Sequence, residues 1–240
     1  MGSIGSNLQE LKQRIGAACA AAARGEQSVT LLAVSKTFGP EAVREAFEAG
    51  QRAFGENYVQ EALAKIDALA DLRPAIEWHF IGPLQSNKTR PVAAAFDWVH
   101  SVDRVKIAER LAEQRPPELP PLQLTLQVNI SGEASKSGVA PADAVALARA
   151  VAALPPARVR LRGLMAIPEP APGFDAQRAP YHRLRELLAA LNADGLALDT
   201  LSIGMSADLD AAIAEGATLV RIGTAIFGSR DSAAAGLPKR

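Results

Sequence analysis

Eight short apolar runs alternate with longer segments of helical periodicity along this chain, and this alternation limits its possible folds more than any other feature. The runs are predicted strands at residues 29–36, 52–56, 76–81, 98–101, 122–130, 159–167, 200–203 and 218–222. Helices are predicted over residues 8–23, 40–49, 58–70, 88–96, 103–114, 141–154, 175–192 and 207–215. Connections of this length favour parallel strands that are joined by helical crossovers.

Eight strand–helix units in a chain of 240 residues predict an α/β fold, a single closed (β/α)8 barrel of the TIM type with an extra N-terminal helix. A doubly wound open sheet is the alternative, because it joins parallel strands in the same way. The proline-rich segment 115–121 leads directly into a strand and is interpreted as a loop. We therefore predict one domain over residues 1–240, with an ordered core at about residues 8–229.

The charge balance and the metal-binding residues exclude several classes of function. The chain carries 26 Lys and Arg against 26 Asp and Glu, whereas nucleic acid and membrane surfaces select a basic excess. No apolar run reaches the length that spans a bilayer, and the first residues lack the features of a secretory signal. One cysteine and three histidines, with no carboxylate cluster at ligand spacing, argue against a metal site. We expect a soluble, cytoplasmic protein without a nucleic-acid or membrane partner.

Lys36 closes the first predicted strand, where the loop over residues 37–40 begins. Its amine can form an imine with an aldehyde. In a barrel of this type functional residues gather where strands end and loops begin, and phosphate is commonly bound by the loops after the seventh and eighth strands. Taken alone, Lys36 is better interpreted as a solvated lysine at a strand end.

The loops after the last two predicted strands contain small residues and hydroxyls, in Gly204-Met205-Ser206 and in Gly223-Thr224. Glycine allows backbone N–H groups to approach an anion closely, and a helix that begins near Ala207 would add its positive end. The alternative is that these glycines only form tight turns. Together with an imine-forming lysine, two anion-binding loops predict an aldehyde that carries a phosphate, and pyridoxal 5'-phosphate is the ligand that we expect.

Arg221 interrupts an otherwise apolar strand. Two-residue alternation places it on the interior face with Leu219 and Gly223. A buried guanidinium needs an acceptor, which would be either a core carboxylate or the pyridine nitrogen of the cofactor. The second contact would keep that nitrogen unprotonated and make the ring a weaker electron sink.

Three further side chains lie near strand ends, namely Asn57, His79 and Met165. Asn57 either caps a helix or contacts the cofactor, and His79 is either a core histidine or a functional one. Residues 135–138 also resemble an anion-binding loop, although Lys and Ser are common in such loops.

Ordered sequence blocks resemble those of the pyridoxal phosphate homeostasis proteins (YggS/PROSC type). They are residues 33–37 (AVSKT), 54–61 (FGENYVQE), 78–88 (WHFIGPLQSNK), 101–103 (SVD), 128–131 (VNIS), 136–138 (KSG), 163–165 (GLM) and the segment 204–228. The resemblance covers about residues 8–228, and its departures are slight, such as Ile203 where methionine is common.

The resemblance implies a single barrel like the N-terminal domain of alanine racemase, the type III fold of pyridoxal phosphate proteins, with the cofactor held as a Schiff base on Lys36. It also implies phosphate contacts from Ser206, Gly223 and Thr224, with Arg221 near the pyridine nitrogen. We add Asn57, His79 and Met165 to the expected cofactor-binding residues.

For function, the resemblance implies intracellular buffering or delivery of pyridoxal phosphate without turnover, with pyridoxal phosphate-dependent apoenzymes as recipients. A small pyridoxal phosphate-dependent amino-acid racemase is the alternative, and a barrel for another phosphate ester would leave Lys36 without its special role. Racemisation needs a proton acceptor on each face of the carbanion. Lys36 can serve one face, whereas alanine racemase-like enzymes take the other base from an additional domain and a partner subunit. We therefore expect a monomeric binding protein and not an enzyme.

Overall fold

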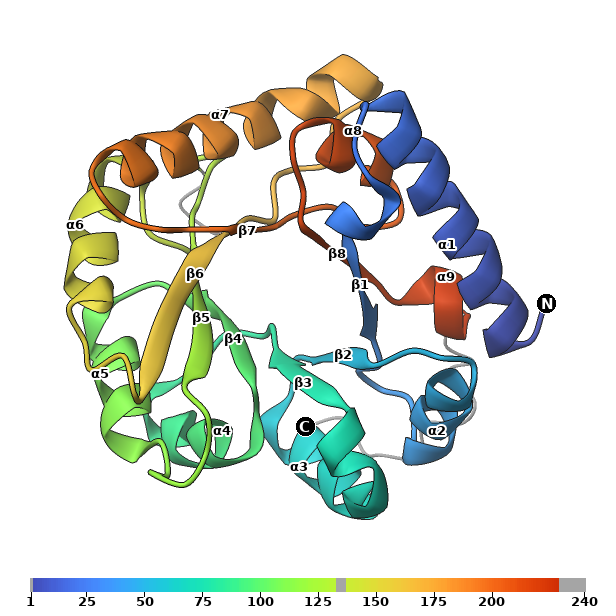
Figure 1. Cartoon of the computed structure of the whole chain (residues 1–240), viewed down its shortest axis with the longest axis horizontal. Helices are drawn as coiled ribbons and strands as arrows, with labels where there is room; N and C mark the ends of the chain where they lie inside the picture. The colour runs from blue at the N-terminus through green and yellow to red at the C-terminus, as the bar shows by residue number, and fades with distance from the viewer. Residues whose placement is uncertain (1, 133–136, 229–240) are drawn as a thin grey trace.

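A closed barrel of eight parallel strands forms the centre of the molecule, in a computed structural model that describes residues 2–132 and 137–228 (Figure 1). The strands are β1 (Thr30–Val34), β2 (Ala53–Glu56), β3 (Glu77–Phe80), β4 (Trp98–Val102), β5 (Leu122–Gln127), β6 (Val159–Met165), β7 (Thr200–Ser202) and β8 (Leu219–Ile222). Each strand pairs with the next along the chain, and β8 closes the barrel on β1. The predicted (β/α)8 barrel is confirmed, and the open sheet is excluded.

Helices surround the barrel on its outside (Figure 1). They are α1 (Ile4–Ala21), α2 (Pro40–Glu48), α3 (Val59–Ala68), α4 (Thr89–Ala95), α5 (Val105–Gln114), α6 (Pro141–Ala152), α7 (Phe174–Ala193), α8 (Leu209–Ala214) and α9 (Thr224–Phe227). Short 3-10 turns cover Glu26–Ser28, Ala70–Ala75 and Ser86–Lys88. Among the described residues no helix is both long and apolar enough to cross a membrane.

The extra N-terminal helix α1 lies along the outside of the barrel beside α8 and α9 (Figure 1). Ser3 begins it, because its side chain accepts a hydrogen bond from the Ser6 N–H. Asn7 then donates to the carbonyl of Ile226 in α9, and Arg14 donates to the carbonyl of Ser206 and pairs with Asp210. The N-terminal helix therefore supports the two loops that follow β7 and β8.

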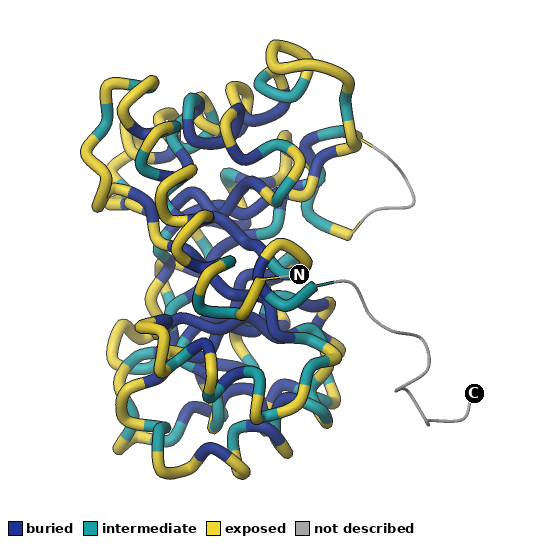
Figure 2. The backbone as a smooth tube through the Cα atoms, turned by 90° about the vertical axis from the view of Figure 1, so that its right-hand side faces the viewer, coloured by how far each residue is buried: buried dark blue, intermediate teal, exposed yellow. Residues whose placement is uncertain are grey.

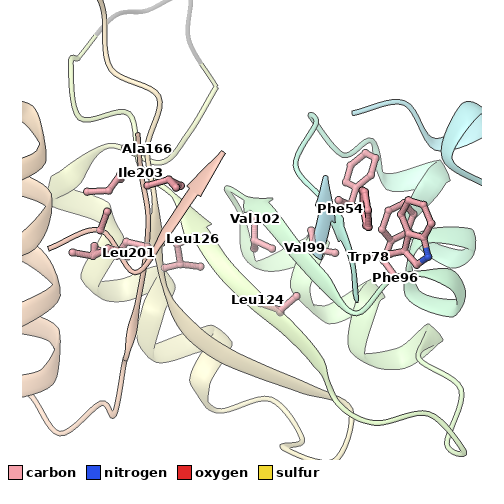
Figure 3. Packing of buried hydrophobic residues seen from close by; sticks show 14 of the residues in the cluster. Phe54, Trp78, Phe96, Val99, Val102, Leu124, Leu126, Ala166, Leu201 and Ile203 are labelled. Carbon is pink, nitrogen blue, oxygen red and sulfur yellow. The ribbon is translucent and has the colours of Figure 1, made fainter. Parts of the chain in front are cut away.

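The main core lies between the strands and the helices. Figure 2 shows the buried residues concentrated along the strands, with exposed residues on the outer helices and loops. Aromatic rings fill the layer outside β2 and β3, where Phe54 packs on Trp78 at 5.8 Å (Figure 3). In the same layer Phe80 packs on Phe96 at 5.4 Å. This layer follows from the sequence, because alternate residues of each strand point outward toward the helices.

The interior of the barrel is divided between apolar and polar side chains. Leu32, Ala53 and Leu219 form a small separate apolar cluster. The buried polar residues include His79, His100, Ser202 and Arg221, which come from β3, β4, β7 and β8. A polar interior must satisfy its own hydrogen bonds, and the arrangement of these four side chains is described below.

Candidate cofactor site

Seven of the eight residues expected to bind the cofactor lie at the C-terminal ends of the strands. Met165 ends β6, Ser206 follows β7, Arg221 lies in β8 with Gly223 and Thr224 after it, Lys36 follows β1, and Asn57 follows β2. These five strands are consecutive around the closed barrel. The fold therefore brings these seven residues to one side of one mouth of the barrel, as the sequence predicted.

The loop that carries Lys36 has a strained backbone. Strand β1 ends at Val34, and the half-buried Lys36 is followed by Thr37 with a φ of 70°. A β-branched residue rarely adopts positive φ, because such a conformation costs about 1–3 kcal/mol and persists only where the surroundings impose it. The Thr37 N–H donates to the Glu61 carboxylate over 2.5 Å, and the ring of Phe38 stacks on that of Phe227 at 5.1 Å. These contacts hold the lysine loop in place.

A buried ion pair between Lys65 of α3 and Glu56 of β2 supports the same loop. Lys65 Nζ lies 2.5 Å from Glu56 Oε1 and 3.2 Å from Glu61 Oε1, and it donates to the carbonyl of Ser35 over 2.9 Å. The Ser35 hydroxyl donates to the same Glu56 oxygen over 2.6 Å. Burial raises the pKa of Glu56, and the Lys65 ammonium opposes that shift. This pair was not predicted; the i, i+4 spacing of Glu61 and Lys65 is the one sequence signal for it.

The loop after β7 turns sharply at Gly204, which has a φ of 92°. A Cβ at this position would lie 2.6 Å from Ala212 Cβ, so only glycine fits. Asp208 holds the loop by accepting the Met205 N–H over 2.7 Å. Because this turn uses the residues up to 208, helix α8 begins at Leu209 and not near Ala207 as predicted.

Asp208 also anchors this loop to helix α7. The Tyr181 hydroxyl donates to Asp208 Oδ2 over 2.6 Å. Burial, followed by the charge of Asp208, raises the pKa of Tyr181, so the phenol stays protonated. Ser206 is half-buried, and its carbonyl accepts from Arg14 over 3.0 Å. The hydroxyl-bearing loop is thus fixed from two helices.

The loop after β8 requires glycine for close approach to β1. A Cβ on Gly223 would lie 3.0 Å from the Val34 carbonyl oxygen. Gly223 is the N-cap of the short helix α9, and the exposed Thr224 begins that helix. The first N–H groups of a helix have no partner within it. The backbone at Gly223 and Thr224 is thus suited to an anion.

Arg221 is buried inside the barrel, as its place in the strand predicted. Its guanidinium donates to the carbonyl and the hydroxyl of Ser202 and, over 2.9 Å, to the carbonyl of Ala166. None of these partners is a carboxylate, so the described residues do not contain the core ion pair that was the alternative. Burial lowers the pKa of Arg221 to about 10, which leaves the group cationic at neutral pH.

Asn57 and Met165 agree with the expected site to different degrees. The N-cap of α3 is Tyr58, and Asn57 Oδ1 is buried without a hydrogen-bond partner among the described residues. The helix-cap alternative for Asn57 is therefore wrong, and its orphaned oxygen favours a contact with a ligand. Met165 is fully buried as the last residue of β6. Of the weak anion-loop candidate at 135–138, residues 135 and 136 lie outside the described residues.

His79 does not lie with the other seven residues. It pairs in register with Trp98, the first residue of β4, and its ring stacks on that indole at 5.4 Å. It lines a cavity of about 300 Å³ together with Thr30 and Thr200, the first residues of β1 and β7. His79 therefore faces the N-terminal mouth, away from the other seven expected residues, and its direct contact with the cofactor stays a prediction that this position does not favour. The mouth that His79 faces could not be predicted from the sequence, because the stagger of neighbouring strands sets the depth of this side chain in the barrel.

A larger cavity, of about 1090 Å³, also lies at the N-terminal mouth. Five arginines line it, and four of them bind structural groups. Arg115 donates to the carbonyls of Ala93, Phe96 and Pro120, and Arg73 pairs with Asp97. In barrels of this type the N-terminal face serves stability and the opposite face carries function. We therefore place the candidate site at the C-terminal mouth.

Comparisons with known proteins agree with this geometry. A family model described as "Alanine racemase, N-terminal domain" matches residues 6–231. The pyridoxal phosphate homeostasis protein of Pseudomonas aeruginosa is 63% identical over 231 residues, which cover 96% of this chain and 97% of the relative. The structure of PipY from Synechococcus elongatus with pyridoxal phosphate bound has a TM-score of 0.81 at 40% identity, covering 94% of this chain and 100% of that chain.

A more distant likeness concerns the fold alone. The alanine racemase of Corynebacterium glutamicum has a TM-score of 0.66 at 21% identity. The match covers 98% of this chain and 62% of the racemase chain. The shared fold thus takes in nearly the whole of this chain and less than two thirds of the racemase.

Proposed function

The chain belongs to the family of pyridoxal phosphate homeostasis proteins, and from that membership we propose that it binds pyridoxal 5'-phosphate at the C-terminal mouth of its barrel and buffers or delivers it in the cell. One observation carries the proposal. Among the described residues, the buried cation Arg221 on β8 donates hydrogen bonds only to neutral groups, and the neighbouring strand β1 leads to Lys36. These are the two groups that the cofactor's ring nitrogen and aldehyde require.

The residues at this mouth fit each chemical group of the cofactor. The Lys36 amine would condense with the aldehyde to form a C=N bond and release one water molecule. The hydroxyls of Ser206 and Thr224 and the backbone at Gly223 suit the phosphate. The orphaned Asn57 oxygen offers an acceptor, and Met165 an apolar wall. When bound, the cofactor supplies an electrophilic aldehyde carbon and an electron-accepting ring.

Arg221 favours storage of the cofactor over catalysis. A guanidinium only donates hydrogen bonds, so a ring nitrogen that it contacts must accept and remain unprotonated. With a pKa of about 10, the Arg221 side chain keeps its charge at neutral pH. An unprotonated ring withdraws electrons more weakly than a pyridinium. The arrangement is suited to holding the cofactor without turning over an amino acid.

We propose that the chain is one cofactor-binding domain that acts in the cytoplasm as a monomer and supplies pyridoxal phosphate-dependent apoenzymes. The names of the relatives support homeostasis over catalysis.

The phosphate loops provide the test of where the cofactor binds. Ser206→Ala should weaken pyridoxal phosphate affinity by about tenfold to a hundredfold, because a hydrogen bond to a charged group contributes roughly 1.5–3 kcal/mol. Gly223→Ala should weaken it further, because the new Cβ would press on the Val34 carbonyl at 3.0 Å. Dissociation constants come from absorption titrations, with the melting temperature of each ligand-free variant as the measure of folding. Ser28→Ala, at the opposite mouth, is the matched control. Wild-type affinity in both folded variants would place the phosphate elsewhere.

A further inference from the structure

Four buried polar side chains cross the interior of the barrel in contact with one another. They are His79 on β3, His100 on β4, Ser202 on β7 and Arg221 on β8. His79 Nδ1 lies 2.9 Å from His100 Nε2, and His100 Nδ1 lies 2.8 Å from Ser202 Oγ. Arg221 Nη1 donates to the same hydroxyl over 2.7 Å. We call these four side chains the interior chain.

The donor-only guanidinium of Arg221 indicates in which direction the hydrogen bonds of the interior chain donate. A guanidinium has no acceptor, so Ser202 Oγ accepts from Arg221 and its own hydrogen is available to His100 Nδ1. With Nδ1 accepting, a neutral His100 carries its proton on Nε2 and donates to His79 Nδ1. Burial, followed by the neighbouring His79 ring and the charge of Arg221, holds the pKa of His100 well below its usual value, so this ring is neutral at physiological pH.

The contact between His79 and Glu77, at the other end, agrees with this direction of hydrogen-bond donation. With Nδ1 accepting, His79 carries its proton on Nε2, which is buried and has no hydrogen-bond partner among the described residues. Glu77 Oε2 lies 3.6 Å from this nitrogen, and both side chains line the cavity of about 300 Å³ at the N-terminal mouth. An N–H at this position is attracted to the carboxylate, whereas a lone pair would be repelled.

The state of Glu77 supports this end of the interior chain. Its second oxygen accepts the indole N–H of Trp98. The neighbouring His79 nitrogen and this indole lower the pKa of Glu77 despite its partial burial. Glu77 is therefore an anion at neutral pH, and the interior chain runs from a cation near one mouth to an anion at the other.

We propose that the hydrogen bonds of the interior chain all donate in one direction, from Arg221 toward His79. In this way the interior chain positions the Arg221 guanidinium and couples it to Glu77 at the opposite mouth. Its histidines and Ser202 are positioning residues, because they act on the site only through Arg221. Hydrogen bonds in series polarise one another in a low-dielectric interior, so each link affects how strongly the guanidinium donates at its far end. The consequence for the cofactor rests on the proposed function, whereas the direction of the interior chain depends on no ligand.

The direction can be measured in the ligand-free protein, because the sequence has only three histidines. Long-range ¹H–¹⁵N correlation spectra of untagged, ¹⁵N-labelled protein should show the Nε2–H tautomer for both His79 and His100. His182 on α7 is the internal reference, assigned through His182→Gln. A His100 protonated on Nδ1 would overturn the proposal, whatever the protein binds.

A break in the interior chain tests its effect on Arg221. Ser202→Ala removes the link, and Ser101→Ala is the matched control, because Ser101 is also buried but donates to the Gly82 carbonyl. Ser202→Ala should raise the Nδ1–H population of His100 and shift the absorption band of the protein loaded with pyridoxal phosphate, whereas the control should change neither. An unchanged His100 tautomer would overturn the interior chain, and an unchanged band would overturn its role at Arg221.

A variant of Glu77, at the N-terminal mouth, tests the interior chain even if Ser202→Ala fails to fold. Glu77→Gln should move the ¹⁵N signals of His79 most, those of His100 less and those of His182 not at all. Asp199→Asn removes a carboxylate from the lining of the same cavity and should leave both interior histidines unchanged. Equal shifts in the two variants would contradict a specific coupling to Glu77. A wild-type protein that binds no pyridoxal phosphate would count against the proposed function only, because these spectra are independent of it.

Discussion

Lys36→Ala is expected to abolish the absorption band of the imine and to remove most of the stabilisation that pyridoxal phosphate gives to the fold. A ligand that binds only the folded state adds roughly 2.7 kcal/mol at a hundred times its dissociation constant. In a domain of this size that corresponds to about 5–10 °C in melting temperature. The wild type should therefore melt higher with the cofactor than without it, and the variant should show little difference. The measurement is a thermal melt of both proteins with and without pyridoxal phosphate.

The same pair of proteins decides between storage and catalysis. The wild type should not racemise alanine or serine at ordinary enzyme rates, because Lys36 supplies a base on one face only. Steady racemisation by the wild type that disappears in Lys36→Ala would favour the racemase alternative. A Lys36→Ala variant that keeps the full thermal shift would show that the cofactor is held without this lysine.

Lys65→Met is expected to destabilise the fold by about 3–5 kcal/mol, because it leaves the buried Glu56 carboxylate without its partner. In a protein of this size that loss corresponds to roughly 6–20 °C in melting temperature. The loss should also loosen the Lys36 loop, since Lys65 donates to the Ser35 carbonyl. Lys106→Met, at an exposed position of α5, is the matched control and should change the melting temperature little.

The pH dependence identifies the cause of this loss. Burial already raises the pKa of Glu56, and Lys65 opposes the shift, so removing Lys65 raises that pKa further. A carboxyl with a raised folded pKa favours the folded state below its unfolded pKa, and this advantage is lost as pH rises through the folded value. The deficit of Lys65→Met should therefore be larger at neutral pH than at about pH 5. A deficit that is the same at both pH values would point to lost packing instead of a buried charge.

The barrel and most of the site could be predicted because they depend on local patterns. Alternation within β8 predicted that Arg221 points inward, and its buried hydrogen bonds confirm this. The positions of Lys36 and Gly223 after their strands followed from where the apolar runs end. Such features repeat every two residues or mark the end of an element, so a sequence contains them directly.

The other features depend on contacts between distant segments. The positive φ of Thr37 is imposed by Glu61, and the start of α8 is moved by the hydrogen bond from the Met205 N–H to Asp208. His79 is buried, which agrees with the core-histidine alternative, and its depth in the barrel is set by the register of β3 against β4. No local pattern reports that register. For this reason the sequence grouped His79 with the cofactor contacts, whereas the fold turns it toward the other mouth.

Borohydride reduction followed by peptide mapping tests the central claim most directly. Reduction converts the C=N bond to a stable C–N bond, so a pyridoxyl group would remain on the lysine that formed the imine. We predict a pyridoxyl adduct on the peptide that contains Lys36, with none on this peptide in Lys36→Ala. An adduct on Lys88 or Lys136 in place of Lys36, or the absence of any adduct from protein saturated with pyridoxal phosphate, would contradict the account.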